Sequence, residues 1–244
     1  MEFEIVKSTH NGGREHNEDS CAFIRTDTGI LLVLADGMGG HQGGEFASQY
    51  FCDAIIESAT SPSSSALPEA SDNMEQMISA AAQAMAARLA TDHPGLDAHT
   101  TCVLAWLSDQ QTLCAHVGDS RCYLLNSERV VWHTRDHSVA QLLVSQGEIT
   151  QDEAATHPDQ SKLYRSIGIS GKPKPTLKHL QPLAADEALL LCSDGLWTSI
   201  TDDELITLAI DQDPQQAIDT IVSTAVKRGG SEGDNVTALM VRKV

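Results

Sequence analysis

Four aspartates stand in closely similar local settings, each beside a glycine. Asp36, Asp119 and Asp194 follow apolar runs typical of buried strands, and Asp234 precedes such a run. We therefore expect the four side chains to project from strand ends into one cleft. Carboxylates brought together would repel one another and raise at least one pKa strongly, and divalent cations would relieve that repulsion. The pattern predicts a metal site for Mg²⁺ or Mn²⁺, which prefer oxygen ligands.

Asp36 is the strongest candidate among these acids. It ends the apolar run 30–35, and a buried carboxylate is costly unless it is paired or holds a metal. No Lys or Arg lies between Asp27 and Arg88, which points to a metal ion rather than a salt bridge. The glycine-rich turn 37–40 would add backbone carbonyls as ligands. A single Asp-Gly pair is more often an exposed β-turn, but here the pattern recurs.

An acidic site of this kind suits phosphoryl hydrolysis. Two metal ions about 3.5 to 4 Å apart are a recurrent solution, in which a bridging water loses its proton and attacks phosphorus in line with the leaving oxygen. The substrate phosphate then needs an anchor. Arg14 could bind it with its forked guanidinium, and Glu18 could add a hard oxygen ligand at the metals. Taken alone, each of these two residues is more simply interpreted as ordinary surface charge.

The hydrophobic periodicity predicts the elements that would position these acids. Apolar runs predict strands at 3–9, 20–25, 29–35, 101–107, 112–117, 121–125, 130–133, 176–180, 188–192 and 235–244. Three- and four-residue spacings and flanking signals predict helices at 44–58, from 74 to about 92, and at 139–146, 151–156, 202–210 and 214–227. We expect a Ser/Pro-rich loop near 59–72. Strands and helices occur in blocks, which indicates an α+β fold with antiparallel sheets.

Composition limits the class of protein. The chain has 244 residues with no evident linker, so we expect a single domain over 1–244. Its formal net charge of −18 argues against nucleic acid and anionic membranes as partners. Six cysteines lie without a C-x-x-C pair, mostly in apolar runs, which is typical of reduced core residues. The N-terminus lacks a signal-peptide pattern and no apolar run approaches about 20 residues, so we expect a cytoplasmic protein.

Several short motifs occur together in one order along nearly the whole chain: residues 14–19, 36–40, 100–101, 117–121, 136–138, 193–197 and 233–237. In this set and order the sequence resembles the metal-dependent protein phosphatase (PPM) family, the protein phosphatase 2C class, in its small stand-alone bacterial form. The resemblance implies a four-layer α-β-β-α sandwich of two mainly antiparallel sheets, with the metals in a cleft between strand ends. It also implies a flap near 137–174 that affects substrate choice more than the chemical step.

The resemblance further implies a role for each candidate residue. Asp36 would bridge two ions, Mn²⁺ or Mg²⁺, and Arg14 would bind the phosphate. The remaining ligands would be Asp194 and Asp234 at the first ion, Glu18 and the carbonyl of Gly37 at the second, and Asp119 at a weaker third ion.

The sequence departs from the family pattern in two places. Many eukaryotic members have a His directly after the Asp-Gly, proposed as the general acid to the leaving oxygen, whereas this chain has Met38. His41 lies nearby on the same turn and could take that catalytic role, or it could equally be a solvated turn residue. The second departure is His99, before Thr100, where the family commonly has Gly.

The function that follows is metal-dependent hydrolysis of phosphoserine and phosphothreonine in proteins, which reverses the action of a Ser/Thr kinase. The expected partners are a phosphorylated protein and a kinase of the same cell, and the expected state is a monomer. The alternative is a catalytically inactive phosphatase-like module that only binds a partner. The complete set of acids argues against this alternative, since a chain that had lost its function would not need to keep them together.

Overall fold

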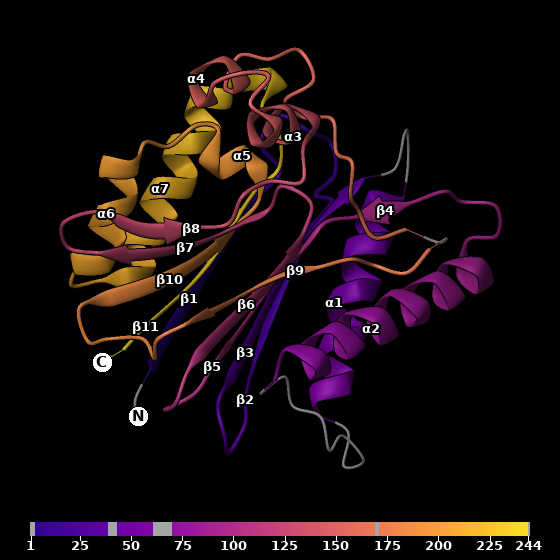
Figure 1. Ribbon diagram of the computed structural model, residues 1–244, viewed down its shortest axis with the longest axis horizontal. Coiled ribbons are helices and arrows are strands. Elements are labelled where there is room, and N and C mark those ends of the chain that lie inside the picture. The colour runs from indigo at the N-terminus through magenta and orange to yellow at the C-terminus, as the bar shows by residue number, and fades with distance from the viewer. Residues whose placement is uncertain (1–2, 39–42, 61–69, 169–170, 244) are drawn as a thin grey trace.

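Two antiparallel β-sheets lie face to face at the centre of the molecule (Figure 1). The computed structural model describes residues 3–38, 43–60, 70–168 and 171–243. The first sheet has the order β1-β11-β10-β7-β8, formed by Phe3–His10, Val236–Lys243, Glu187–Cys192, Arg121–Asn126 and Val130–His133. The second has the order β2-β3-β5-β6-β9, formed by Asp19–Arg25, Ile30–Met38, Cys102–Leu107, Thr112–Val117 and Thr176–Leu180. The two-residue strand β4, His99–Thr100, pairs with the end of β3.

Helices cover the outer face of each sheet, which gives the expected sandwich (Figure 1). The second sheet is covered by α1 (Gly44–Thr60) and α2 (Ser71–Asp92). The first is covered by α5 (Asp194–Trp197), α6 (Asp202–Ile210) and α7 (Pro214–Gly229). The short 3₁₀ turn η1 (Gly230–Glu232) follows α7.

The strand that carries Asp36 is buried on both faces. Leu31 and Val33 of β3 pack against the helices, while Leu32 and Leu34 face the aliphatic core between the sheets. This double burial explains the continuous apolar run, because a strand with two covered faces has no polar alternation. Full burial of each such side chain stabilises the fold by roughly 1.5–3 kcal/mol. The end of β3 is therefore a rigid platform for Asp36.

The predicted strands and helices are confirmed, with ends that shift by at most three residues. Three details differ. Asp36 lies inside β3 rather than after it, because the next two residues pair with β4, a strand too short to show a periodicity. Asp194 begins α5, a single turn that the pattern did not reveal. Both ends of the loop predicted near 59–72 are helical, since α1 ends at Thr60 and α2 begins at Ser71; residues 61–69 lie outside the described part.

The segment predicted as a flap, residues 137–174, connects the first sheet to the second. It contains α3 (Val139–Gln146) and α4 (Gln151–Ala154), the latter two residues shorter than predicted. Thr100 and Ile167 form an isolated bridge, with N–H to carbonyl distances of 2.8 Å in both directions. This bridge ties the end of the segment to β4, beside the strand that carries Asp36.

The core is otherwise as the sequence indicated. All six cysteines are free thiols and five of them are buried. Met74, Met77 and Met85 of α2 are buried against the second sheet. Within the described ranges, no helix has the length and apolar character needed to cross a membrane.

Candidate active site

Asp36 is held firmly by the backbone around it. In the β2–β3 hairpin it pairs in register with Asp19, so two carboxylates stand on adjacent strands. Its carbonyl accepts hydrogen bonds from the Thr101 N–H at 2.8 Å and from the Thr100 hydroxyl at 2.9 Å. Its own N–H donates to the Thr101 hydroxyl at 3.0 Å. The Thr-Thr pair noted in the sequence therefore fixes the position of Asp36.

The remaining aspartates lie in three other segments, each at the end of a strand: after β6, after β10 and before β11. Asp119 follows β6 and comes directly after Gly118, whose φ of 104° is a conformation that side chains rarely adopt. Asp194 begins α5 two residues after β10 ends, and Asp234 precedes β11. The prediction that these acids project from strand ends near Asp36 agrees with this placement.

Electrostatics show that these acids share one space. Burial raises the pKa of Asp36 well above its usual value, and repulsion raises it further, from Asp19, Asp194, Asp119 and Asp234 in decreasing order. Burial likewise raises the pKa of Asp119 to about 8, of Asp19 to about 7 and of Asp194 to about 6. A cation is needed to keep them ionised together at neutral pH. We call these five side chains the carboxylate cluster.

Glu18 lies beside the cluster, and burial raises the pKa of its carboxyl group. Its N–H donates to the side-chain oxygen of Asn235 at 2.7 Å, and its carbonyl accepts from the Gly37 N–H at 3.0 Å. A Cβ at Gly44 would fall 2.7 Å from Glu18 Oε2 and 2.8 Å from the backbone carbonyl carbon of Gly37, so a larger residue would displace the carboxylate or the backbone beside it. The predicted ligands Glu18 and Gly37 therefore sit together, next to the start of α1.

Asp19 is the site residue that the sequence prediction missed. Its Oδ2 accepts a hydrogen bond from the Ser193 hydroxyl at 2.7 Å, whereas its buried Oδ1 has no hydrogen-bond partner in the described part of the chain. A signal was present, because Asp19 closes the 14–19 motif and begins a strand that a short turn connects to β3. Only the hairpin register, however, shows that it stands opposite Asp36.

The donors gathered here fit a divalent metal ion. They are carboxylate and carbonyl oxygens, one of them a buried carboxylate oxygen without a partner, and their mutual repulsion calls for positive charge. Among the described residues, no three His, Cys, Asp or Glu side chains converge closely enough to hold an ion by themselves. Backbone carbonyls and water would therefore have to complete the coordination of an ion, and Mg²⁺ usually keeps several waters.

An aromatic ring and a buried ion pair support Asp119. The Trp197 Nε1–H donates to the carbonyl of Asp119 at 2.9 Å. The Arg121 guanidinium lies 3.5 Å from the centre of the Trp197 ring and makes two 2.8 Å hydrogen bonds to Asp136. Such a bidentate pair is among the strongest side-chain interactions, so the ring has little freedom to move. The loop between β6 and β7, which carries Asp119, is thereby anchored to α5.

Arg14 lies at the exposed rim of the cluster. Its Nη2 donates to Asp234 Oδ2 at 2.9 Å, and its side chain is 57% exposed. A guanidinium carries five N–H donors in a planar fork, so this contact leaves most of them available. The glycines before Arg14 pack closely on the loop that precedes β11, where a Cβ at Gly12 would lie 1.8 Å from the Asp234 carbonyl oxygen. The loop of Arg14 and the loop of Asp234 thus form one unit.

The two residues that depart from the family pattern, Met38 and His99, both lie in the described part of the chain. His41 lies outside the described residues, so its predicted role as general acid stays a prediction. His99 pairs with Met38 between β4 and β3, and its ring packs against the flap. A Cβ at Gly168 would lie 2.4 Å from the His99 ring, and His99 Nδ1 lies 3.3 Å from the Ser166 hydroxyl. His99 therefore joins the end of the flap to the strand beside Asp36.

Comparison with known proteins decides which family this arrangement represents. A family model for protein phosphatase 2C matches residues 8–228. The chain belongs to the protein phosphatase 2C family. It is 31% identical over 238 residues to a serine/threonine phosphatase stp of Listeria innocua, with 94% of this chain and 91% of that protein covered.

Solved structures of this family have the same fold. The crystal structure of the serine/threonine phosphatase Stp1 from Staphylococcus aureus superposes with a TM-score of 0.83 at 30% identity, covering all of this chain and 96% of that one. The catalytic domain of the phosphatase PstP, in complex with two manganese ions, gives a TM-score of 0.78 at 28% identity, covering 98% and 97%. The chain is thus a metal-dependent protein serine/threonine phosphatase. The comparisons favour the active enzyme over the inactive binding module.

Proposed function

We propose that this protein phosphatase 2C member reverses the action of a Ser/Thr kinase of the same cell, and that the reaction takes place at the carboxylate cluster. One observation carries the assignment of the site. Burial and mutual repulsion raise the pKa of Asp36, and four further aspartates from distant parts of the chain contribute to that repulsion. Such an arrangement costs stability unless cations occupy it, which supports a metal site at the cluster.

The proposed ligands follow from this arrangement. Asp36, at the junction of three strands, would contact two ions, Mn²⁺ or Mg²⁺. The other ligands would be Asp194 and Asp234 at the first ion, Glu18 and the carbonyl of Gly37 at the second, and Asp119 at a weaker third. Ions held here supply a nucleophile from water at neutral pH and stabilise charge on the phosphoryl oxygens.

Side chains of the protein would bind the phosphate, orient the carboxylates and supply a proton. Arg14, exposed at the rim, would bind two phosphate oxygens through its fork and hold phosphorus in line with the attack. Ser193 and the Thr100–Thr101 pair orient Asp19 and Asp36, so these carboxylates need not reorganise during the reaction. His41, five residues after Asp36 in the sequence, would give a proton to the leaving serine or threonine oxygen.

We further infer a cytoplasmic monomer. All six cysteines are free thiols, as is usual in a reducing compartment. Large apolar side chains are exposed at four scattered positions in the described part of the chain, too dispersed for a stable subunit interface: Phe23, Val131, Tyr164 and Ile210. Light scattering during gel filtration tests the monomer directly.

The decisive experiment measures phosphate release from a phosphothreonine peptide. The wild-type protein should be active with Mn²⁺ and inactive with EDTA. Asp36→Asn should lower kcat/KM by about 1,000-fold or more, because it removes a charge that stabilises both ions. Metal-independent turnover would contradict the proposal.

The matched control is Asp27→Asn, at the other end of the same hairpin. Asp27 is exposed in the turn between β2 and β3, so its amide variant tests the loss of a carboxylate from this element without touching the cluster. It should retain full activity. Equal losses of activity in the two variants would show that activity depends on an intact hairpin and not on the charge of Asp36.

A further inference from the structure

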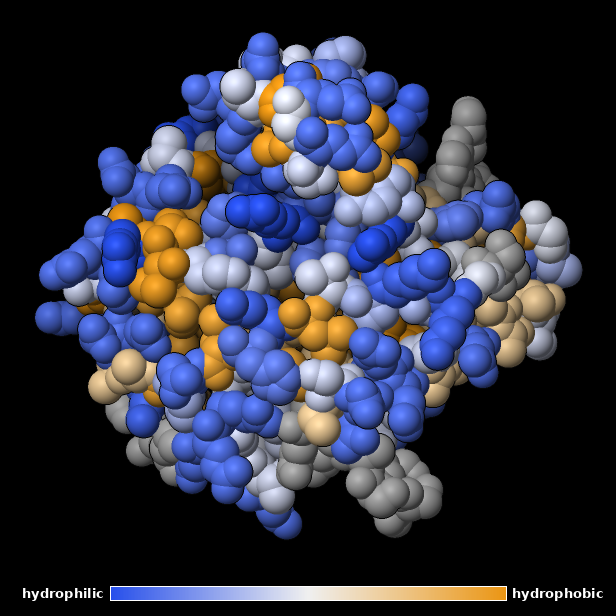
Figure 2. All heavy atoms as spheres, in the orientation of Figure 1, coloured by the Kyte–Doolittle hydropathy of each residue, from blue (hydrophilic) through white to orange (hydrophobic). Residues whose placement is uncertain are grey.

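A cavity opens at the edge of the sandwich, and none of the residues that line it belongs to the carboxylate cluster. Its volume is about 430 Å³, within the range of about 300–1,000 Å³ typical of small-molecule sites. It lies between β8 and β9, which are the edge strands of the two sheets, with β6 behind them. Figure 2 shows hydrophobic surface among hydrophilic side chains on the face that carries β6 and β9. We call this space the edge cavity.

The inner wall of the edge cavity, its floor, is formed by Cys114 and by the rings of Trp132 and His116. Burial lowers the pKa of His116, so its ring is uncharged at neutral pH, and its Nε2 is engaged with the Arg135 carbonyl at 2.8 Å. Two rings of this kind favour a planar, aromatic occupant.

The hydroxyl groups that line the edge cavity already have partners. Thr134 accepts the backbone N–H of Cys122 at 3.1 Å, and Thr176 lies 2.9 Å from Nε2 of His137. The floor therefore offers few free hydrogen bonds to a ligand. Specific polar recognition has to come from the rim.

The rim is positively charged in a strongly acidic protein. Arg135 and Lys178 line the edge cavity, both are exposed, and neither forms an ion pair within the described residues. No Asp or Glu lines it, although the chain has 34 acidic and only 16 basic residues. Two unpaired cations beside an apolar floor attract an anion and can be satisfied by one.

We propose that the edge cavity binds a small planar aromatic molecule that carries an anionic group. The ring lies against Trp132 and His116, and the anion meets Arg135 and Lys178 at the rim. Nucleoside monophosphates and aromatic carboxylates share this chemistry. The site goes beyond the phosphatase activity, because its lining residues are separate from the carboxylate cluster.

The edge cavity is separate from the active site but close to it. The His116 ring stacks on the His137 ring, with centroids 4.5 Å apart and planes 6° apart. His137 Nδ1 accepts the N–H of Gly118, the residue before Asp119, at 3.1 Å. One layer of side chains therefore lies between an occupant of the edge cavity and the backbone that carries Asp119.

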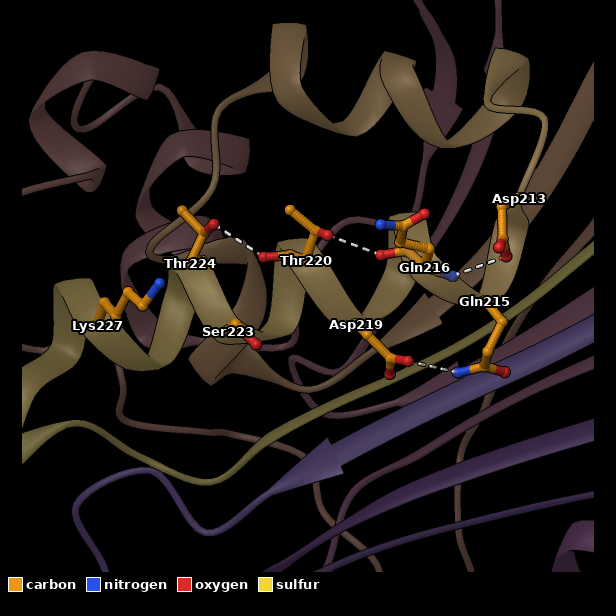
Figure 3. Close-up of a pocket in the computed structure, with 8 residues that line it drawn as sticks. All are labelled: Asp213, Gln215, Gln216, Asp219, Thr220, Ser223, Thr224 and Lys227. Atoms are coloured by element: carbon orange, nitrogen blue, oxygen red, sulfur yellow. Dashed lines mark hydrogen bonds between the residues drawn. The ribbon is translucent and has the colours of Figure 1, made fainter.

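A larger depression along α7 offers a contrast (Figure 3). Its side chains bond within their own helix, as Thr224 does to the Thr220 carbonyl at 2.8 Å and Gln215 to Asp219 at 3.1 Å. It has no aromatic wall and includes two acidic side chains. It lacks the features that select an aromatic anion, but its exposed Lys227 provides a matched control.

The test uses the aromatic sulfonate 1-anilinonaphthalene-8-sulfonate, whose fluorescence rises in apolar sites, titrated into the Mn²⁺-loaded protein. Arg135→Glu combined with Lys178→Glu should weaken its binding by about tenfold or more, because two charge-assisted contacts are lost. Lys227→Glu should leave the affinity unchanged. Thermal melting verifies that each variant is folded, and the single Lys178→Gln should show a smaller loss in the same direction.

Competition identifies the kind of natural occupant. Displacement of the probe by adenosine 5′-monophosphate would indicate a nucleotide, and displacement by indole-3-carboxylate an aromatic acid. Unchanged probe affinity in the rim variants, or displacement by neither compound at millimolar concentration, would overturn the proposal. Displacement by the phosphothreonine peptide would also overturn it, since the edge cavity would then be part of the substrate site.

Discussion

At the scale of single residues, the contact between Arg14 and Asp234 links substrate binding to the metal site. The 2.9 Å contact holds the guanidinium at the rim before any substrate arrives. Both side chains are substantially exposed, so the pair adds little to stability. The pair instead orients the guanidinium of Arg14 for substrate binding. An arginine held by one carboxylate presents its other N–H groups to an incoming phosphate.

Arg14→Ala should therefore raise KM for a phosphothreonine peptide more than it lowers kcat. Loss of a bidentate, charge-assisted contact is worth about 1.5–3 kcal/mol, so kcat/KM should fall by about 10- to 150-fold. Steady-state kinetics at saturating Mn²⁺ measure the effect. The control is Arg88→Ala, which removes an equally exposed Arg–Asp pair on the helical side of the molecule. A purely kcat effect for Arg14→Ala would place Arg14 outside phosphate binding.

His41→Ala tests the proposed general acid. A proton is needed by a poor leaving group such as a threonine alkoxide, but not by nitrophenolate. The variant should lose activity on a phosphothreonine peptide by about 100-fold, while hydrolysis of nitrophenyl phosphate changes much less. Equal losses on the two substrates would remove His41 from this role.

At the scale of elements, the two-residue strand β4 connects the flap to the active site. On one side it pairs with Gly37 and Met38 of β3, and on the other Thr100 bridges to Ile167. The His99 ring fills the space over Gly168. The histidine that departs from the family pattern thus has a physical explanation, since it replaces open space with a contact between β4 and the flap.

Gly168→Ala should destabilise this junction. The new Cβ would lie 2.4 Å from the His99 ring, which must rotate away from Ser166. Overpacking of this kind costs about 1–3 kcal/mol, or about 2–4 °C in melting temperature per kcal/mol.

Two further variants make the Gly168 experiment specific. Gly229→Ala serves as the matched control, because nothing lies within 4 Å of its Cβ position, and it should leave the melting temperature nearly unchanged. The double change His99→Ala with Gly168→Ala should cost less than the sum of the single changes. Strict additivity would show that the two residues do not contact each other.

At the scale of the whole molecule, the carboxylate cluster opposes folding unless cations neutralise it. Burial raises the pKa of Asp119 to about 8 and of Asp19 to about 7, against about 3.9 for an unfolded chain. Between these values the native state binds more protons than the unfolded state, so the free energy of unfolding falls as pH rises toward 8. His137, whose pKa burial lowers to about 3, acts in the opposite sense below about pH 6.5.

The decline should therefore run from about pH 4 to about pH 8 in the metal-free protein, and its part between about pH 6.5 and 8.5, which His137 does not offset, is the part to measure. Ionisation of the cluster there costs on the order of 2 kcal/mol, which lowers the melting temperature by several degrees. Saturating Mn²⁺ should raise the melting temperature and remove most of this slope, because the ion stabilises the ionised carboxylates. Thermal melts with EDTA and with Mn²⁺ measure both effects. A flat or rising profile in EDTA would contradict the electrostatic account.

The sequence by itself determined the chemistry and the elements of this protein. Acids beside glycines at the ends of apolar runs indicated a metal site, and the ordered motifs indicated a protein phosphatase, which the comparisons show. Apolar periodicity located the strands and helices, because side-chain burial repeats with the local geometry of each element. These inferences rest on residues that are close together in the chain.

Only the tertiary structure decided how distant residues meet. The β2–β3 register places Asp19 opposite Asp36, Trp197 of α5 donates to the carbonyl of Asp119, and the His99 ring contacts the flap at Gly168. The edge cavity likewise exists because the two sheets end side by side. The physical reason is common to all of them. Register and packing depend on contacts between segments far apart in sequence, and local periodicity carries no record of those contacts.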